Sequence, residues 1–263
     1  MSLLTRGVRT VRSDGVDRAL LLTVRYVSSL ISYSDRMSRL PPVLASAIFA
    51  LTAGWVRMTL RALRRIYPKK YTDADPYRVL YVDPAEIERI SGLHDRKRRG
   101  WVVGGNWDRD GDQFLDQPIP RSIYEHYVEE VPWDETCLSD LYSNEKRFNE
   151  KCDSIENLYE RIQKDGFRSH KERLQDDPTT AWQNVNTTIA PHTDEITVDI
   201  GRDGEILWNM LGKHRLSIAK VAGVEEVPVL VFSRHEEWQD IRDRFRSTGE
   251  IPKKHHDHPD LRL

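Results

Sequence analysis

The sequence predicts a mixed α+β domain behind a basic helical extension, and three observations lead to that fold class. Apolar residues alternate or run together, as in strands, at 77–82, 196–200, 206–208 and 227–232. Apolar residues at helical spacing lie before, between and after these stretches. Charge is also divided along the chain: residues 1–71 hold thirteen lysines and arginines against three aspartates, whereas the remainder is acidic. Such a shift indicates two units of different character.

Composition places the chain among soluble globular proteins. Of its 263 residues, 31% are charged and 38% are hydrophobic, which suits a modest core. The two cysteines, Cys137 and Cys152, have neither a pairing pattern nor metal-ligand spacing, so we expect reduced thiols and no zinc site. The first fifteen residues lack the apolar segment of a secretory signal. These features favour a cytoplasmic location.

The basic extension, residues 1–71, is expected to form two helices. The first follows Asp17 and has apolar residues at helical spacing at Leu20, Val24, Val27 and Ile31. The second is expected from Pro41–Pro42 to Ile66. Its expected apolar face consists of Leu44, Ile48, Leu51, Trp55 and Met58.

Four roles are open for this extension. Residues 40–56 carry no charge, a run of seventeen that reaches only the lower limit of a membrane-spanning helix, roughly 17–25 residues. An amphipathic helix lying on an anionic membrane is a second role, because apolar and arginine-rich faces are combined. A basic arm that contacts DNA is a third. The plainest role is a helical hairpin docked on the acidic remainder of the chain or on a partner.

The main domain, expected over residues 75–250, begins with the strand at 77–82. Asp83 is expected to cap a short helix that begins at Pro84 and runs through Ile90. An insertion of about residues 105–190 follows, helical over 118–165 and rich in loops over 168–186. The twin glycines at 104–105 are typical of a chain reversal.

One aspartate-rich stretch and one histidine-rich stretch contain metal-ligating side chains, but neither has the pattern of a metal site. Aspartates stand at 108, 110, 112 and 116, but an EF-hand loop needs Gly at its sixth and Glu at its twelfth position, and neither is present. The polar tail, residues 251–263, contains His255, His256 and His258 on a short segment. A designed site needs defined geometry, so no structural metal is expected there.

The stretch from Glu195 to Arg234 organises the domain. Its pattern predicts a strand, an Asp-Gly turn, a second strand, a helix opened by Gly212 and a final buried strand. Lys213, His214 and Arg215 would then stand at a helix N-terminus, where free N–H groups and the positive end of the helix dipole attract anions. The sequence therefore predicts an anion site, most naturally for phosphate.

These residues resemble the core of the ParB/sulfiredoxin superfamily. The resemblance rests on a glycine-led basic helix start, an alanine-containing helix, a glycine and a Val-Pro-Val strand. The matching residues are Gly212, Lys213, His214, Arg215, Ala219, Gly223, Val227, Pro228 and Val229. A second block, Val79 to Ile87, is similar to the first strand and helix entry of that family. Together the two blocks cover about a quarter of the chain. The resemblance implies a small mixed sheet with packed helices.

In that family the glycine-led box binds the phosphates of a nucleotide. The resemblance implies that Gly212 lets the backbone approach the ligand and that Arg215 contacts phosphate oxygens in bidentate fashion. His214 would donate to the same anion. Lys213 stands where sulfiredoxins have their catalytic cysteine, so sulfinic-acid reduction is excluded.

Three functions follow as alternatives. The first is binding of a nucleoside di- or triphosphate with Mg²⁺, which allows phosphotransfer with Glu86 and Asp83 as catalytic carboxylates, and Asp199 or Asp203 as further candidates. The second is a nucleic-acid-associated ParB-like protein, although no helix-turn-helix pair follows Arg215. The third is a non-catalytic module anchored to a membrane surface by the N-terminal helices.

Overall fold

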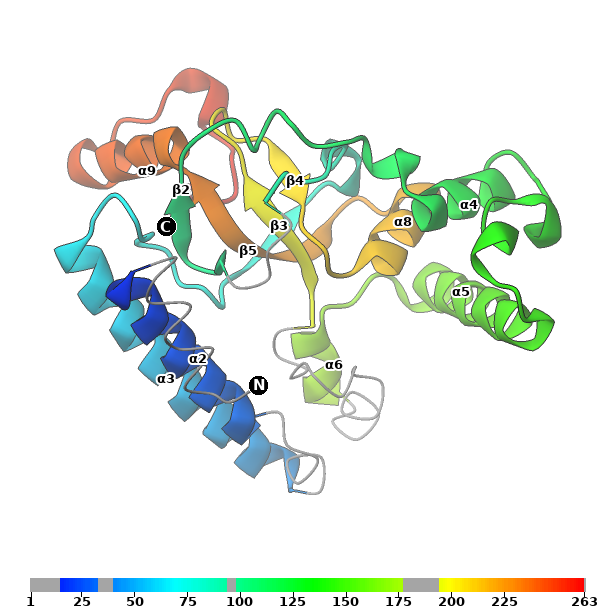
Figure 1. Cartoon of the computed structure of the whole chain (residues 1–263), viewed down its shortest axis with the longest axis horizontal. Coiled ribbons are helices and arrows are strands. Elements are labelled where there is room, and N and C mark those ends of the chain that lie inside the picture. The colour runs from blue at the N-terminus through cyan, green and yellow to red at the C-terminus, as the bar shows by residue number, and fades with distance from the viewer. Residues whose placement is uncertain (1–14, 33–39, 94–97, 177–193, 263) are drawn as a thin grey trace. The chain divides into compact units, whose positions relative to one another are not determined.

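The computed structural model describes residues 15–32, 40–93, 98–176 and 194–262. These residues form seven α-helices and a five-stranded mixed sheet (Figure 1). The mixed class expected from the sequence is therefore confirmed, and the ParB-like fold stays a prediction. The chain divides into two compact units, one formed by residues 1–78, 99–102 and 170–194, the other by residues 79–98, 103–169 and 195–263. Residues 1–14 and 33–39 of the expected extension, and 177–190 of the expected insertion, lie outside the described residues.

The first unit is built on a helical hairpin. Its helices are α2 (Val16–Ser32) and α3 (Pro42–Ile66), which lie side by side along their length (Figure 1). Asp17, in the first turn of α2, accepts a hydrogen bond of 2.9 Å from the Tyr71 hydroxyl, and the guanidinium of Arg18 lies over the ring of Trp101. Helix α6 (His170–Asp176) also belongs to this unit. Two helices are thus present where the spacing predicted them.

The apolar face expected for α3 does not face α2. Four of its five members are exposed: Leu44, Leu51, Trp55 and Met58, with Leu51 at 75% and Met58 at 68%. The buried side consists instead of the mostly small residues Ala45, Thr52, Ala53 and Val56, followed by Leu60 and Leu63. Small residues allow two helices to approach closely, so α2 packs on the small face and the large apolar side chains point away.

One described helix, Val43–Ile66, is long and apolar enough to cross a membrane, by length and composition alone. Only 28% of its most apolar window is buried inside the structure. The core helix of a soluble protein passes the same test but is mostly buried.

The second unit contains the main sheet path, in the order β1-β5-β3-β4. The strands are β1 (Val79–Val82), β3 (Ile196–Ile200), β4 (Ile206–Trp208) and β5 (Val227–His235). Strands β3 and β5 are parallel, and β1 and β4 are antiparallel to their neighbours. The short β2 (Trp101–Val103) falls at the chain boundary between the two units.

Strand β3 is buried on both faces, although its alternation predicted a half-buried strand. Thr197 and Asp199 are fully buried along with the three apolar residues. They tolerate burial because their polar atoms have partners: the Thr197 hydroxyl donates to the Asn209 carbonyl, and Asp199 accepts from Ser91 and Asn209 side chains and from the Ser233 N–H.

Helices α4 (Pro118–Tyr127), α5 (Glu145–Asp165) and α8 (Lys213–Val221) share an apolar cluster beside the sheet. Ile123, Ile155 and Ile218, one from each helix, are fully buried in it. Short 3-10 turns η5 (Trp133–Glu135) and η6 (Ser139–Leu141) connect α4 to α5. The helical insertion expected over 118–165 is present in this form.

Two local expectations are wrong. The helix expected from Pro84 through Ile90 is only the turn η2 (Pro84–Glu86), because Arg89 and Ile90 form β-bridges with Gln113 and Trp208. The tail at 251–263 is no free segment in its described part. It follows α9 (Glu236–Thr248), forms the turn η8 (Lys253–His255), and buries Asp260 and Leu261 against the second unit.

Candidate functional site

The site predicted at the start of α8 begins with Gly212. Its φ is 79°, in the left-handed region that favours glycine. A Cβ at this position would lie 2.8 Å from the Cα of Ile196 in β3. Any larger residue at position 212 would therefore clash with Ile196, the first residue of β3. Packing alone explains the glycine. Approach of a ligand to the backbone, which the resemblance implies, is compatible with this conformation but is not needed to explain it.

The N-terminus of α8 is uncapped and basic. The first intrahelical hydrogen bond runs from the Leu216 N–H to the Gly212 carbonyl at 2.9 Å, and Gly212 has no side chain that could cap the helix. The N–H groups that precede this bond belong to Lys213, His214 and Arg215. A helix start usually carries an acceptor side chain, so donors and positive charge are concentrated here without one.

A third basic residue, Lys151 of α5, joins Lys213 and His214. Burial lowers the pKa of Lys151, and the charge of Lys213 lowers it further. Burial, followed by the charges of Lys151 and Lys213, lowers the pKa of His214 to about 3, so its ring is neutral at pH 7. Burial also lowers the pKa of Lys213. We call Lys151, Lys213 and the neutral His214 the cation cluster, after its two ammonium groups.

No acid neutralises this cluster within the part of the chain that the structure describes. Neither Lys151 nor Lys213 forms an ion pair there. The Nε2 of His214 is buried and has no hydrogen-bond partner among the described residues. Two half-buried ammonium groups and an unsatisfied ring nitrogen thus meet at a helix N-terminus, an arrangement that costs stability unless an anion is bound.

Arg215 is arranged differently from its neighbours. One guanidinium nitrogen, NH1, lies 3.3 Å from a carboxylate oxygen of Glu195, whose side chain is 1% exposed. The Arg215 side chain is itself 13% exposed. Part of its guanidinium is therefore engaged in a buried internal pair, and its bidentate contact to phosphate stays a prediction.

The predicted catalytic carboxylates do not lie at the N-terminus of α8. Asp83 accepts a hydrogen bond of 2.7 Å from the Ala85 N–H, which is the capping role expected of it, and lies near the second half of α8. Lys213 and Lys220 are about 10 Å apart along the helix axis. Glu86 is exposed. Of the further candidates, Asp203 pairs with Lys254 at 2.8 Å, and Asp199 is sealed in the core.

The residues at the cation cluster do not fit a magnesium ion. Mg²⁺ bound with a nucleotide needs carboxylate or similar oxygen ligands. Glu195, whose carboxylate lies beside the first turn of α8, is paired with Arg215. Among the described residues there is no group of three or more histidine, cysteine, aspartate or glutamate side chains placed to hold a metal.

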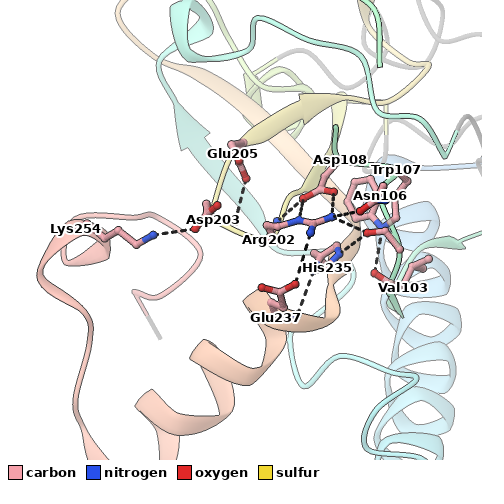
Figure 2. Close-up of polar contacts among 11 residues, drawn as sticks. Val103, Asn106, Trp107, Asp108, Arg202, Asp203, Glu205, His235, Glu237 and Lys254 are labelled. Atoms are coloured by element: carbon pink, nitrogen blue, oxygen red, sulfur yellow. Dashed lines mark hydrogen bonds and ion pairs between the residues drawn. The ribbon is translucent and has the colours of Figure 1, made fainter. Parts of the chain in front are cut away.

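The glycine turn at 104–105 and Asp108, the first of the aspartates after it, belong to an internal network, and Figure 2 shows its polar contacts. Arg202 donates to both oxygens of Asp108 at 2.7 Å and to the Gly105 carbonyl at 2.7 Å. His235 makes a 2.9 Å hydrogen bond to the same carbonyl. Burial alone would raise the pKa of Asp108, but the hydrogen bonds from Arg202 lower it to about 2. The turn at 104–105 is thus a chain reversal that the ion pair between Arg202 and Asp108 stabilises.

Sequence reasoning missed two lysines of this region. Lys151 belongs to the cation cluster, and Lys220 lines a cavity on the other half of α8. Each is an ordinary lysine on an amphipathic helix, and only the packing of α4, α5 and α8 places them.

No family model, no curated protein and no solved structure matches this chain. The resemblance to the ParB/sulfiredoxin superfamily therefore stays a prediction carried by the residues quoted for it.

Proposed function

We propose that this protein binds a phosphate-bearing anion at the N-terminus of α8, with Lys151, Lys213 and His214 as its side-chain contacts. One observation carries the proposal: basic groups gather, half-buried and with no acid paired to them among the described residues, where the helix dipole already disfavours them. An anion would relieve the repulsion, accept from the N–H groups of Lys213 and His214 in the first turn of α8 and satisfy the buried Nε2 of His214.

A nucleotide or another phosphate ester is the ligand class that this arrangement supports. A phosphate offers several acceptor oxygens to convergent donors, and two ammonium groups match its charge. The nucleotide binding implied by the resemblance agrees with this class. Binding is favoured over phosphotransfer because Asp83 and Glu86 are not among the groups at the cation cluster.

Isothermal titration calorimetry with inorganic phosphate, ADP, ATP and CTP tests the proposal. We expect at least one of them to bind the wild type, and Lys213→Met to weaken that binding at least tenfold, about 1.4 kcal/mol. Lys254→Met is the matched control, because Lys254 lies on the surface in a pair with Asp203. Equal binding by wild type and Lys213→Met, or no binding of any of the four, would contradict the proposal.

A second candidate function, attachment to an anionic membrane surface, is favoured by the outward face of α3. Between Val43 and Met58 the exposed residues of that helix are all apolar, and Val43 is 81% exposed. A helix exposed to water normally has a polar outer face. Arg61 and Arg65 continue the exposed surface toward the C-terminal end of the helix. Apolar side chains followed by arginines are typical of a helix lying in a lipid interface.

Co-sedimentation with vesicles containing phosphatidylserine tests this second candidate. We expect Leu51→Glu to abolish sedimentation, because a charge placed on the apolar face opposes its insertion. Leu141→Glu is the control, since Leu141 is exposed to 48% but lies in the second unit. Absence of vesicle binding by the wild type would refute the candidate. Retention on DNA that is lost on deleting residues 1–71 would support the nucleic-acid alternative instead.

A further inference from the structure

A cavity of about 700 Å³ lies beside the second half of α8. Its walls come from η2, η4 (Phe114–Asp116), α4 and α8, all within the second unit. None of the residues of the cation cluster lines it. Its volume falls within the range of small-molecule sites, roughly 300–1,000 Å³. The cavity is therefore a separate feature from the anion site.

The inner wall of the cavity is apolar. Ile87 and Phe114 are fully buried there, and Pro120 of α4 is buried beside them. At the mouth, Leu115 and Val128 remain 36% and 48% exposed. A largely apolar ligand would cover these side chains, and their removal from water would favour its binding.

The polar groups of the cavity limit the charge of that ligand. Three carboxylates line it, those of Asp83, Glu88 and Glu225, against the single amine of Lys220. An anion would be repelled by this excess of negative charge. The Lys220 amine contacts the Ala85 carbonyl at 3.4 Å, a long hydrogen bond. An ammonium has three N–H donors, so it retains capacity for an acceptor on the ligand.

We propose that this cavity binds a neutral, largely apolar small molecule through a carbonyl oxygen that accepts a hydrogen bond from Lys220. The apolar wall selects the body of the molecule, the carboxylates exclude anions, and the amine orients the carbonyl. This site is independent of the anion site, and either can fail without the other.

Photolabelling with benzophenone tests this proposal, because benzophenone is a neutral, apolar ketone that cross-links on irradiation. Peptide mapping by mass spectrometry is expected to find label in segments 113–128 and 217–225. Val128→Trp, which fills the mouth, should reduce that label at least fivefold. Leu141→Trp is the matched control, because Leu141 is also exposed to 48% and does not line the cavity.

The role of Lys220 has its own readout. Lys220→Met keeps roughly the length of the side chain but removes the hydrogen-bond donor. We expect about tenfold weaker concentration-dependent labelling, because one hydrogen bond to a charged group is lost. Label spread evenly over the chain, or unchanged by Val128→Trp, would overturn the cavity site. Unchanged labelling of Lys220→Met would overturn the assignment of the carbonyl contact.

Discussion

Asp199 shows how a single buried carboxylate is built into this fold. It is fully buried in β3 and accepts hydrogen bonds from Ser91 Oγ at 2.6 Å, Asn209 Nδ2 at 2.7 Å and the Ser233 N–H at 2.8 Å. Burial raises its pKa to about 6, and the three hydrogen bonds limit the rise. The sequence marked Asp199 as a further candidate for the catalytic carboxylate of phosphotransfer, but its hydrogen bonds to Ser91, Asn209 and Ser233 explain it as a buried link within the sheet.

The raised pKa of Asp199 predicts a pH dependence of stability. Its folded pKa lies above its unfolded value of 3.8, so its contribution is fully present below that value and is lost as pH rises through about 6. Between pH 7 and pH 5 this single group should increase the free energy of unfolding by about 1 kcal/mol. Urea unfolding at each pH measures it.

The control for this prediction is Asp199→Asn, which has no titrating group at this position. The buried histidines of the tail act in the opposite direction, because burial lowers the pKa of His258. They are common to both proteins, so the difference between wild type and variant isolates Asp199. A difference that does not change between pH 7 and pH 5 would show that Asp199 stays ionised over this range.

At the scale of elements, the side chain of Asp260 joins the C-terminal tail to the end of β5 and to α9. Asp260 lies 2.5 Å from an Arg234 nitrogen and 3.0 Å from an Arg242 nitrogen, and it accepts from the Trp238 indole at 2.9 Å. All four side chains are buried. Burial would raise the pKa of Asp260, but the two arginines lower it to about 2. The tail is therefore part of the folded unit.

We expect Asp260→Ala to reduce the free energy of unfolding by about 3–5 kcal/mol, because it removes the buried carboxylate that both Arg234 and Arg242 contact. Asp257→Ala, three residues earlier, should change it by less than about 0.5 kcal/mol, since the Asp257 side chain is 96% exposed. Chemical denaturation of both variants measures the contrast. Similar stability of the two would mean that the tail contributes little to the unit.

How far the sequence predicts each element depends on what determines it. Helix α3 follows from its spacing and its N-terminal proline, because local preferences set a helix. Which of its faces is buried does not follow, because the small residues Ala45 and Ala53 are selected by the approach of α2 rather than by hydrophobicity. The packed tail was missed for a similar reason, since a polar stretch gives no sign that Asp260 will meet two arginines.

For the whole molecule, the sequence predicted the mixed class and the succession of strand, strand, helix and strand along residues 195–234, because β3, β4 and β5 each have a clear pattern. It also located a basic helix start behind Gly212. It could not show that Lys151 would join Lys213 and His214, or that Glu195 would engage Arg215, because both depend on how separate elements pack. The charge division between the two parts of the chain is a property of the sequence alone.

The central claim is that the cation cluster destabilises the free protein and is relieved by a bound anion. Urea unfolding of wild type and Lys213→Met, with and without pyrophosphate at constant ionic strength, tests it most directly. We expect Lys213→Met to be more stable than wild type without anion by about 0.5–1 kcal/mol, because a cation leaves the helix N-terminus. Pyrophosphate should stabilise the wild type and leave the variant unchanged. A less stable variant, together with a wild type indifferent to pyrophosphate, would contradict the claim.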